Sequence, residues 1–149
     1  MYVHCACGRR HWGRHGAAGL LLTDVGRTGV LLQRRSALVH HGGTWALMGG
    51  AIEPGESALE AALREAHEEE GLDLRSVTPV RTFLGTEHPD WTYTYVLAEA
   101  SRPRDPVVTL GGGWESDGAR WVDLDDVPAL GLHPSLRADW PRVLAAITD

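Results

Sequence analysis

A chain of 149 residues with a formal net charge of −6 suits one domain spanning residues 1–149, large enough to bury roughly two thirds of its unfolded surface. The acidic balance argues against nucleic acid as the main partner, because phosphate contacts need a basic surface. No stretch approaches the roughly 20 apolar residues of a membrane span, and two cysteines are too few for a disulfide framework, which predicts a reducing, cytoplasmic compartment.

Residues 1–16 form an N-terminal arm that is rich in Gly, Arg and His. Four of its side chains could in principle bind Zn²⁺: His4, Cys5, Cys7 and His11. The Cys-x-Cys spacing is tighter than that of typical zinc ligands, and no second cysteine pair follows downstream. We favour a plain strand or arm in which Trp12 packs as a lid, and the sequence leaves the metal question open.

Two apolar segments, 17–25 and 29–33, come next and are separated by Gly26-Arg27-Thr28, which predicts a β-hairpin. Their nearly continuous apolar character predicts burial on both faces. The segment that leads on to Trp45 carries four side chains that could contact the phosphates of a substrate: Arg34, Arg35, His40 and His41. The alternative for each of them is solvated surface.

A glycine-rich loop, 49–55, precedes a helix whose two ends are marked in the sequence. Ser57 and Glu60 form a capping-box pair at its start, and Gly71 can end it in a left-handed conformation. At helical spacing one apolar face should pack on a sheet, and it consists of Leu59, Ala62, Leu63 and Ala66. A second face gathers three carboxylates, with small residues leaving room beside them: Glu65, Glu68 and Glu69, next to Ala58 and Ala61.

The clustered glutamates of this helix destabilise it unless a cation is bound. Like charges three and four residues apart cost a few tenths of a kcal/mol per pair, on the order of 0.2–0.5. Residues 53–73 hold eight acidic residues against Arg64 alone, a local charge of −7, whereas the rest of the chain is close to neutral. A divalent cation with oxygen ligands would explain the cluster, and a solvated acidic face is the alternative.

The order of residues around these glutamates resembles the Nudix box, which fixes nine positions over residues 50–72. The matching residues are Gly50, Glu56 and the run Arg64-Glu65-Ala66-His67-Glu68-Glu69-Glu70-Gly71-Leu72. Eight positions match, and Ala66 is smaller than the aliphatic residue usual in its slot. The preceding stretch, 43–50, is also similar to the family, although Met48 stands where Pro is common. The resemblance implies an α/β fold, the Nudix-type α/β/α sandwich with a mixed sheet between helices.

The C-terminal half supplies further strands and a closing helix. Strands are predicted at 77–84, 91–99 and 119–124, with a turn at 86–90 and loops at 101–106 and 111–113. Three aromatic residues of the second of these strands should share one face, where they could stack a nucleobase or simply pack: Trp91, Tyr93 and Tyr95. A helix over 134–147 should cover the second face of the sheet through Leu136, Trp140, Val143, Leu144 and Ile147.

The family resemblance implies metal-dependent hydrolysis of a nucleoside diphosphate linked to another group, with Mg²⁺ or Mn²⁺ as cofactor. It implies metal ligation by Glu65, Glu68, Glu69 and the Gly49 carbonyl, with support from Glu56. Arg64 is expected to orient a neighbouring carboxylate. The general base is Glu68 or Glu115, and Asp117 and Glu87 stand in reserve. The expected catalytic set is therefore Glu68, Glu69, Glu115 and Arg64, with substrate contacts from Arg34, Arg35, Trp91, Tyr93 and Tyr95.

The substrate is narrowed by elimination. The family's ADP-ribose, dinucleoside polyphosphate and coenzyme A branches carry markers that are absent here, since Glu87, His88 and Pro89 stand where Pro or Tyr is expected. The chain is most similar to MutT-like enzymes, which cleave (deoxy)nucleoside triphosphates to a monophosphate and pyrophosphate, with 8-oxo-dGTP as one candidate. Open alternatives are a non-catalytic nucleotide- or sugar-sensing module and an isomerase, although Cys5 and Cys7 are poorly placed for the latter. A homodimer is possible.

Overall fold

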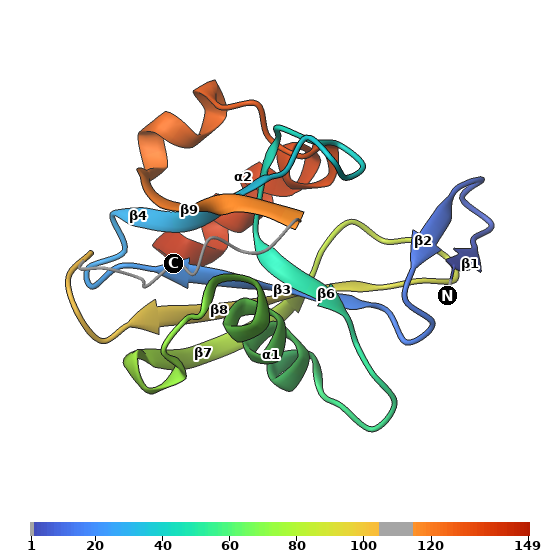
Figure 1. The fold of residues 1–149 in the computed structure, drawn as a ribbon, viewed down its shortest axis with the longest axis horizontal. Coiled ribbons are helices and arrows are strands. Elements are labelled where there is room, and N and C mark those ends of the chain that lie inside the picture. Colours follow the sequence, from blue (N-terminus) through green and yellow to red (C-terminus); the bar gives the residue numbers. More distant parts are fainter. Residues whose placement is uncertain (1, 105–114) are drawn as a thin grey trace.

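A seven-stranded sheet forms the middle layer of the molecule (Figure 1). The computed structural model describes residues 2–104 and 115–149, so the predicted loop at 111–113 and the end of that at 101–106 lie outside the described residues. The strands are β3 (Ala17–Thr23), β4 (Gly29–Arg35), β5 (Trp45–Ala46), β6 (Met48–Ala51), β7 (Val77–Leu84), β8 (Tyr93–Ala100) and β9 (Ser116–Asp123). Their order is β5-β4-β3-β8-β7, with β6 also paired to β3 and β9 to β4.

The sheet is mixed, because β3 pairs with β8 in parallel while its other pairings are antiparallel. Helix α1 (Ala58–Glu70) covers one face, and α2 (Pro134–Thr148) covers the other. Short 3-10 helices connect these elements, and they include η1 (Leu74–Ser76) between α1 and β7 and η3 (Leu124–Ala129) between β9 and α2. This α/β/α arrangement confirms the predicted fold class.

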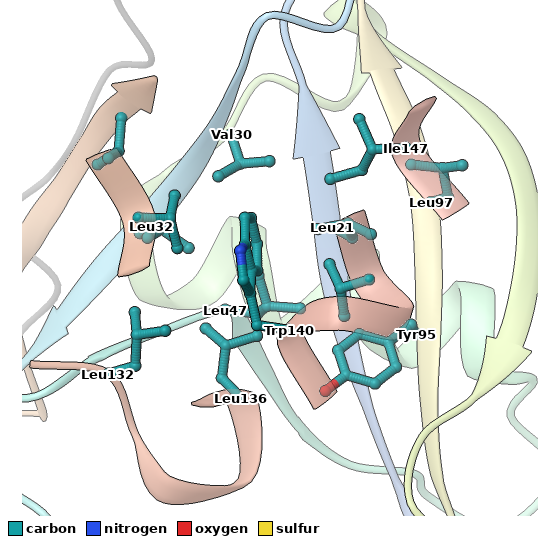
Figure 2. Packing of buried hydrophobic residues seen from close by; sticks show 13 residues of the cluster. Leu21, Val30, Leu32, Leu47, Tyr95, Leu97, Leu132, Leu136, Trp140 and Ile147 are labelled. Atoms are coloured by element: carbon teal, nitrogen blue, oxygen red, sulfur yellow. The ribbon is translucent and has the colours of Figure 1, made fainter. Parts of the chain in front are cut away.

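Two hydrophobic clusters lie on opposite faces of the sheet. Under α2, Trp140 and Ile147 pack against Leu21, Leu97 and other residues of the strands (Figure 2). The cluster under α1 is built from smaller residues, three of them alanines of the helix itself: Ala61, Ala62 and Ala66. Small side chains allow the helix to approach the sheet closely, so α1 carries its carboxylates near to β6 and β4.

Strand β3 is the centre of the sheet, and every one of its seven residues is buried, as the apolar run predicted. The predicted hairpin to β4 is present, with an antiparallel pairing of Thr23 and Val30. Its turn is held by the Asp24 carboxylate, which accepts hydrogen bonds from the backbone N–H groups of Thr28 (2.7 Å) and Gly29 (3.1 Å). Beyond the turn the strands diverge, and β6 takes the place of β4 beside β3, while β8 pairs with the other edge of β3 along its whole length.

The ends of α1 confirm the capping prediction. The Glu60 N–H donates to the Ser57 hydroxyl at 3.0 Å, the Ser57 N–H donates to the Glu60 carboxylate at 3.1 Å, and Gly71 is left-handed with φ of 67°. The predicted division of faces is partly wrong. Ala61 is fully buried in the core rather than lining the carboxylate face, and Leu59 is only partly buried.

Replacing Ser57 with Ala should lower the free energy of unfolding by about 1 kcal/mol, because one N–H of the first turn loses its acceptor. Urea denaturation followed by circular dichroism measures this change. Ser101→Ala removes a hydroxyl from an exposed residue without such a role and should stay within about 0.5 kcal/mol of the parent protein. Equal destabilisation by the two substitutions would contradict a capping role for Ser57.

Three further expectations need correction. Gly49 and Gly50 lie in strand β6 rather than in a loop, because they pair with Gly19 and Ala18 of β3. Trp12 is 55% exposed and does not pack as a lid. Trp91 lies just before strand β8 and not within it. Within the described residues, no helix is long and apolar enough to cross a membrane.

Candidate active site

Glu69 is the most enclosed carboxylate on the site face of α1. Its Oε1 accepts a hydrogen bond from the Gly49 N–H at 3.2 Å, and its Oε2 accepts one from Gln33 Nε2 at 2.6 Å. Burial raises the pKa of Glu69 to about 8, and the charge of Glu65 adds to the rise. Burial likewise raises the pKa of Glu65. Two neighbouring carboxylates are therefore held where their negative charge is poorly compensated.

The glycines of β6 make room for these carboxylates. A Cβ atom at Gly50 would lie 2.6 Å from the carboxyl carbon of Glu65, and one at Gly49 would lie 2.2 Å from the Ala18 carbonyl oxygen. The contact at Gly49 is with backbone, so that position requires glycine, whereas a side chain at Gly50 would displace the Glu65 carboxylate. The paired glycines of the sequence thus serve close approach of strand, strand and helix.

Arg64 holds the outer carboxylates of the site together. Its guanidinium donates to both oxygens of Glu56, at 2.8 and 3.0 Å, to Glu65 Oε1 at 2.9 Å and to the Ala51 carbonyl at 3.1 Å. The hydrogen bonds from Arg64 lower the pKa of Glu56 to about 2. These contacts place Arg64 among the carboxylates, as an orienting residue would be.

Glu68 lies apart from the enclosed pair. Its side chain is 58% exposed and reaches Arg64 Nη1 only at 3.5 Å. Within residues 2–104 and 115–149, no three carboxylates bring their oxygens within 4.8 Å of one another. The structure thus brings together Glu65, Glu69 and the Gly49 peptide, ties Glu56 to them through Arg64, and leaves Glu68 at the rim.

The enclosed pair fits a hard divalent cation. Carboxylate oxygens are the ligands that Mg²⁺ and Mn²⁺ take in proteins, and a cation beside Glu65 and Glu69 would compensate the charge that their raised pKa values report. The N–H of Gly49 donates to Glu69, so the carbonyl of the same residue lies close to this pair.

Behind Glu69 lies a group of buried polar residues that was not predicted from the sequence, and it consists of Gln33, Glu70 and Ser116. Glu70 is fully buried, and its Oε1 accepts hydrogen bonds from Gln33 Nε2 at 3.0 Å and from the Ser116 hydroxyl. Its Oε2 has no partner within the described part of the chain. Gln33 thus bridges Glu69 and Glu70 from strand β4. A polar residue at the end of the apolar run 29–33 was the available signal.

Two of the predicted substrate-binding aromatic residues border a cleft of about 450 Å³ that is lined by residues 84–89 and 91–93. Trp91 stacks on His11 with 4.5 Å between ring centroids, and its indole N–H contacts the carbonyls of Trp12 and Gly13. Tyr93 lies near the carboxylates. Its pKa is raised, first by burial and then by the negative charge of Glu69.

Tyr95 is a core residue rather than a substrate contact. It is 2% exposed, stacks on Phe83 and donates its hydroxyl hydrogen to Asp139 Oδ2 at 2.7 Å. A ring buried in this way has no free face for a nucleobase. We therefore leave Tyr95 out of the candidate site.

The remaining predicted residues lie on the ends of β4 and β9. Arg35 is partly buried and donates from Nε to the His40 carbonyl at 3.0 Å, whereas Arg34 is exposed. Glu115 is exposed, and its carbonyl accepts from the Ser36 N–H at 3.0 Å, directly before the Ser116 that contacts Glu70. The reserve carboxylate Glu87 lines the cleft.

Comparison with known proteins matches this chain to one family. The family model described as NUDIX domain matches residues 13–144. A protein of Bifidobacterium longum named nucleoside triphosphate pyrophosphatase/Nudix hydrolase fusion protein is 39% identical over 99% of this chain. A Mycobacterium tuberculosis protein named "Putative 8-oxo-dGTP diphosphatase 3" is 40% identical over 93% of this chain. The chain spans 31% and 66% of the length of these two relatives.

A solved structure shows the same similarity over nearly its whole length. The crystal structure of the Nudix hydrolase RenU from M. smegmatis has a TM-score of 0.86 to this chain and 39% sequence identity. The match covers 99% of this chain and 96% of that one.

Proposed function

This chain belongs to the Nudix family, and we propose that it is a divalent-metal-dependent pyrophosphohydrolase of (deoxy)nucleoside triphosphates that yields a monophosphate and pyrophosphate. The observation that carries the proposal is the pair of enclosed carboxylates, Glu65 and Glu69, against the glycines of β6. Two enclosed carboxylates destabilise a helix that has only a structural role. A triphosphate, which is itself negatively charged, can approach them only if a cation lies between.

In this proposal Glu65, Glu69 and the Gly49 carbonyl hold Mg²⁺ or Mn²⁺, with Glu56 and Glu68 in support. The cation, when bound, offsets phosphate charge and acidifies water. Gln33 fixes the orientation of the Glu69 carboxylate through its 2.6 Å hydrogen bond, and Arg64 does the same for Glu65 and Glu56. Two exposed carboxylates, Glu68 and Glu115, are the candidates for the base that takes a proton from the attacking water.

We assign substrate binding to residues at the end of β4 and around the cleft. Arg35, at the end of β4, carries the positive charge that a triphosphate tail needs, and exposed Arg34 adds to it. Trp91 and Tyr93 border the cleft and offer aromatic surface to a base. The similarity to a protein named for 8-oxo-dGTP favours a damaged purine triphosphate among these substrates.

A product assay tests the proposal directly. The purified full chain is incubated with 8-oxo-dGTP, dGTP, ATP, ADP-ribose and diadenosine tetraphosphate, with Mg²⁺ or with EDTA, and products are separated by ion-exchange chromatography. The expected products are monophosphate and pyrophosphate, formed only with the metal and fastest from 8-oxo-dGTP. Binding of these nucleotides without cleavage would favour the sensing module and overturn the proposal. Preferential cleavage of diadenosine tetraphosphate would overturn the substrate assignment alone.

A further inference from the structure

The N-terminal hairpin is a separate small sheet at one end of the molecule (Figure 1). It consists of β1 (Tyr2–His4) and β2 (Arg10–Trp12), which pair antiparallel. Among residues 2–12, Cys5 alone is buried. An isolated two-stranded hairpin is marginally stable in water, so this one has no adequate hydrophobic core of its own.

The turn of the hairpin gathers two thiols and an imidazole. The Cys5 N–H donates to the Arg9 carbonyl and the Gly8 N–H to the Cys5 carbonyl, both at 3.0 Å. Gly8 has φ of 90°, which other residues rarely adopt. This tight turn brings the two thiols to the same side although the Cys-x-Cys spacing is shorter than that of typical zinc ligands. It brings Cys7 Sγ to 3.2 Å from His11 Nε2.

Backbone N–H groups already point at the buried sulfur. Cys5 Sγ accepts from the Cys7 N–H at 3.5 Å and from the Asp90 N–H at 3.4 Å. Such hydrogen bonds stabilise the negative charge of a thiolate, which is the form that binds metals. Asp90 contributes a second contact to the turn, because its carboxylate accepts from the Ala6 N–H at 2.7 Å.

The three donor atoms have the spacing of a metal site. Cys5 Sγ, Cys7 Sγ and a ring nitrogen of His11 all lie within 4.8 Å of one another. Tetrahedral ligands at about 2.0–2.3 Å from zinc are separated by about 3.3–3.8 Å, so only small side-chain movements are needed. His4, which the sequence offered as a fourth ligand, is not a member of this group.

We propose that Cys5, Cys7 and His11 bind a zinc ion, with water in the fourth position on the exposed side of Cys7. Thiolate and imidazole ligands select Zn²⁺ over the hard cations that carboxylates bind. Each cysteine releases its thiol proton on binding, and the two thiolates balance the charge of the ion. This site uses none of the residues of the proposed pyrophosphohydrolase site and does not depend on that function.

The zinc would fix one wall of the cleft that is lined by residues 84–89 and 91–93. His11 stacks on Trp91, and Asp90 holds the hairpin turn through Ala6 and Cys5. Trp91 and its neighbours line the cleft. An ion that immobilises the hairpin therefore also immobilises the segment 88–91 against it.

A metal titration of the reduced, metal-free full chain tests the proposal. Co²⁺, as a spectroscopic substitute, should produce a thiolate-to-cobalt charge-transfer band that saturates at one ion per chain and disappears when Zn²⁺ is added. Cys7→Ser and His11→Ala should weaken Zn²⁺ binding at least about tenfold. His4→Ala is the matched control on the same hairpin and should leave binding unchanged.

Hydrogen exchange provides a second readout, and its main comparison is made on the wild-type protein with and without Zn²⁺. In the wild-type protein, Zn²⁺ should slow exchange in residues 2–12 and 88–91, and the effect should be absent in His11→Ala. Absence of a charge-transfer band, equal loss of binding in His4→Ala and His11→Ala, or a Cys5–Cys7 disulfide in the protein purified without reductant would each overturn the proposal.

Discussion

Glu69→Gln should lower kcat by about a hundredfold or more while the protein stays folded. Gln is nearly isosteric with Glu, but its amide has one fewer oxygen and no charge with which to bind a cation. Steady-state rates of pyrophosphate release in saturating Mg²⁺ measure the effect. Glu53→Gln removes the same charge from an exposed position in the loop of the box and should leave kcat within about twofold.

The same substitution should stabilise the metal-free protein, in opposition to its effect on activity. Burial raises the pKa of Glu69 from 4.5 to about 8 in the folded state, so the folded state binds a proton that the unfolded state has lost. Stability that is present below pH 4.5 is then lost progressively as the pH rises towards 8. Gln cannot ionise and avoids this loss.

Thermal unfolding in EDTA at a series of pH values checks the second effect. The melting temperature of Glu69→Gln should exceed that of the wild type at pH 8, and the difference should shrink towards zero near pH 4.5. Wild-type turnover in Glu69→Gln would show that Glu69 does not bind the metal. A pH-independent difference in melting temperature would show that its carboxyl is not buried as described.

Asp139→Ala should lower the free energy of unfolding by about 3 kcal/mol, the largest stability change we expect from a polar substitution. Asp139 is 5% exposed on α2 and accepts hydrogen bonds from the Tyr95 hydroxyl at 2.7 Å and the Thr86 N–H at 3.1 Å. Its removal leaves the buried Tyr95 hydroxyl without an acceptor and frees the Thr86 N–H. Urea denaturation of the metal-free protein measures the loss.

The control for this substitution is Asp126→Ala, which removes a carboxylate from an exposed residue of η3 and should change stability by less than about 0.5 kcal/mol. Because Asp139 also anchors Thr86 at the cleft, the variant should raise KM more than it changes kcat. Similar unfolding curves for the two variants would show that the Tyr95–Asp139–Thr86 contacts contribute little.

The elements that the sequence predicted well are those whose signal is local. The capping residues and the terminal glycine of helix α1 lie within fifteen positions of the sequence. The nearly continuous apolar run of β3 predicted a strand that is buried on both faces. The fold class followed from the resemblance of residues 50–72 to a known motif. Each of these inferences required no knowledge of distant contacts.

The features that the sequence did not reveal depend on pairings between distant segments. Glu70 of helix α1 is buried where two strands meet it, because Gln33 of β4 and Ser116 of β9 both donate hydrogen bonds to its carboxylate. Tyr95 and Tyr93 share one strand and one face, yet only Tyr95 meets the carboxylate of Asp139 from α2. Period-two spacing gives the face of a strand but not what covers it, which is why the aromatic residues could not be separated beforehand.

The guanidinium of Arg64 has a consequence for how the protein matures. Because this one side chain pairs with Glu56, Glu65 and Glu68, it offsets part of their mutual repulsion, and newly made polypeptide can reach its native shape before a divalent cation binds. Chelators should then silence the enzyme reversibly without melting it. Removal of the zinc ion that we propose for the amino-terminal hairpin should instead loosen that end of the molecule.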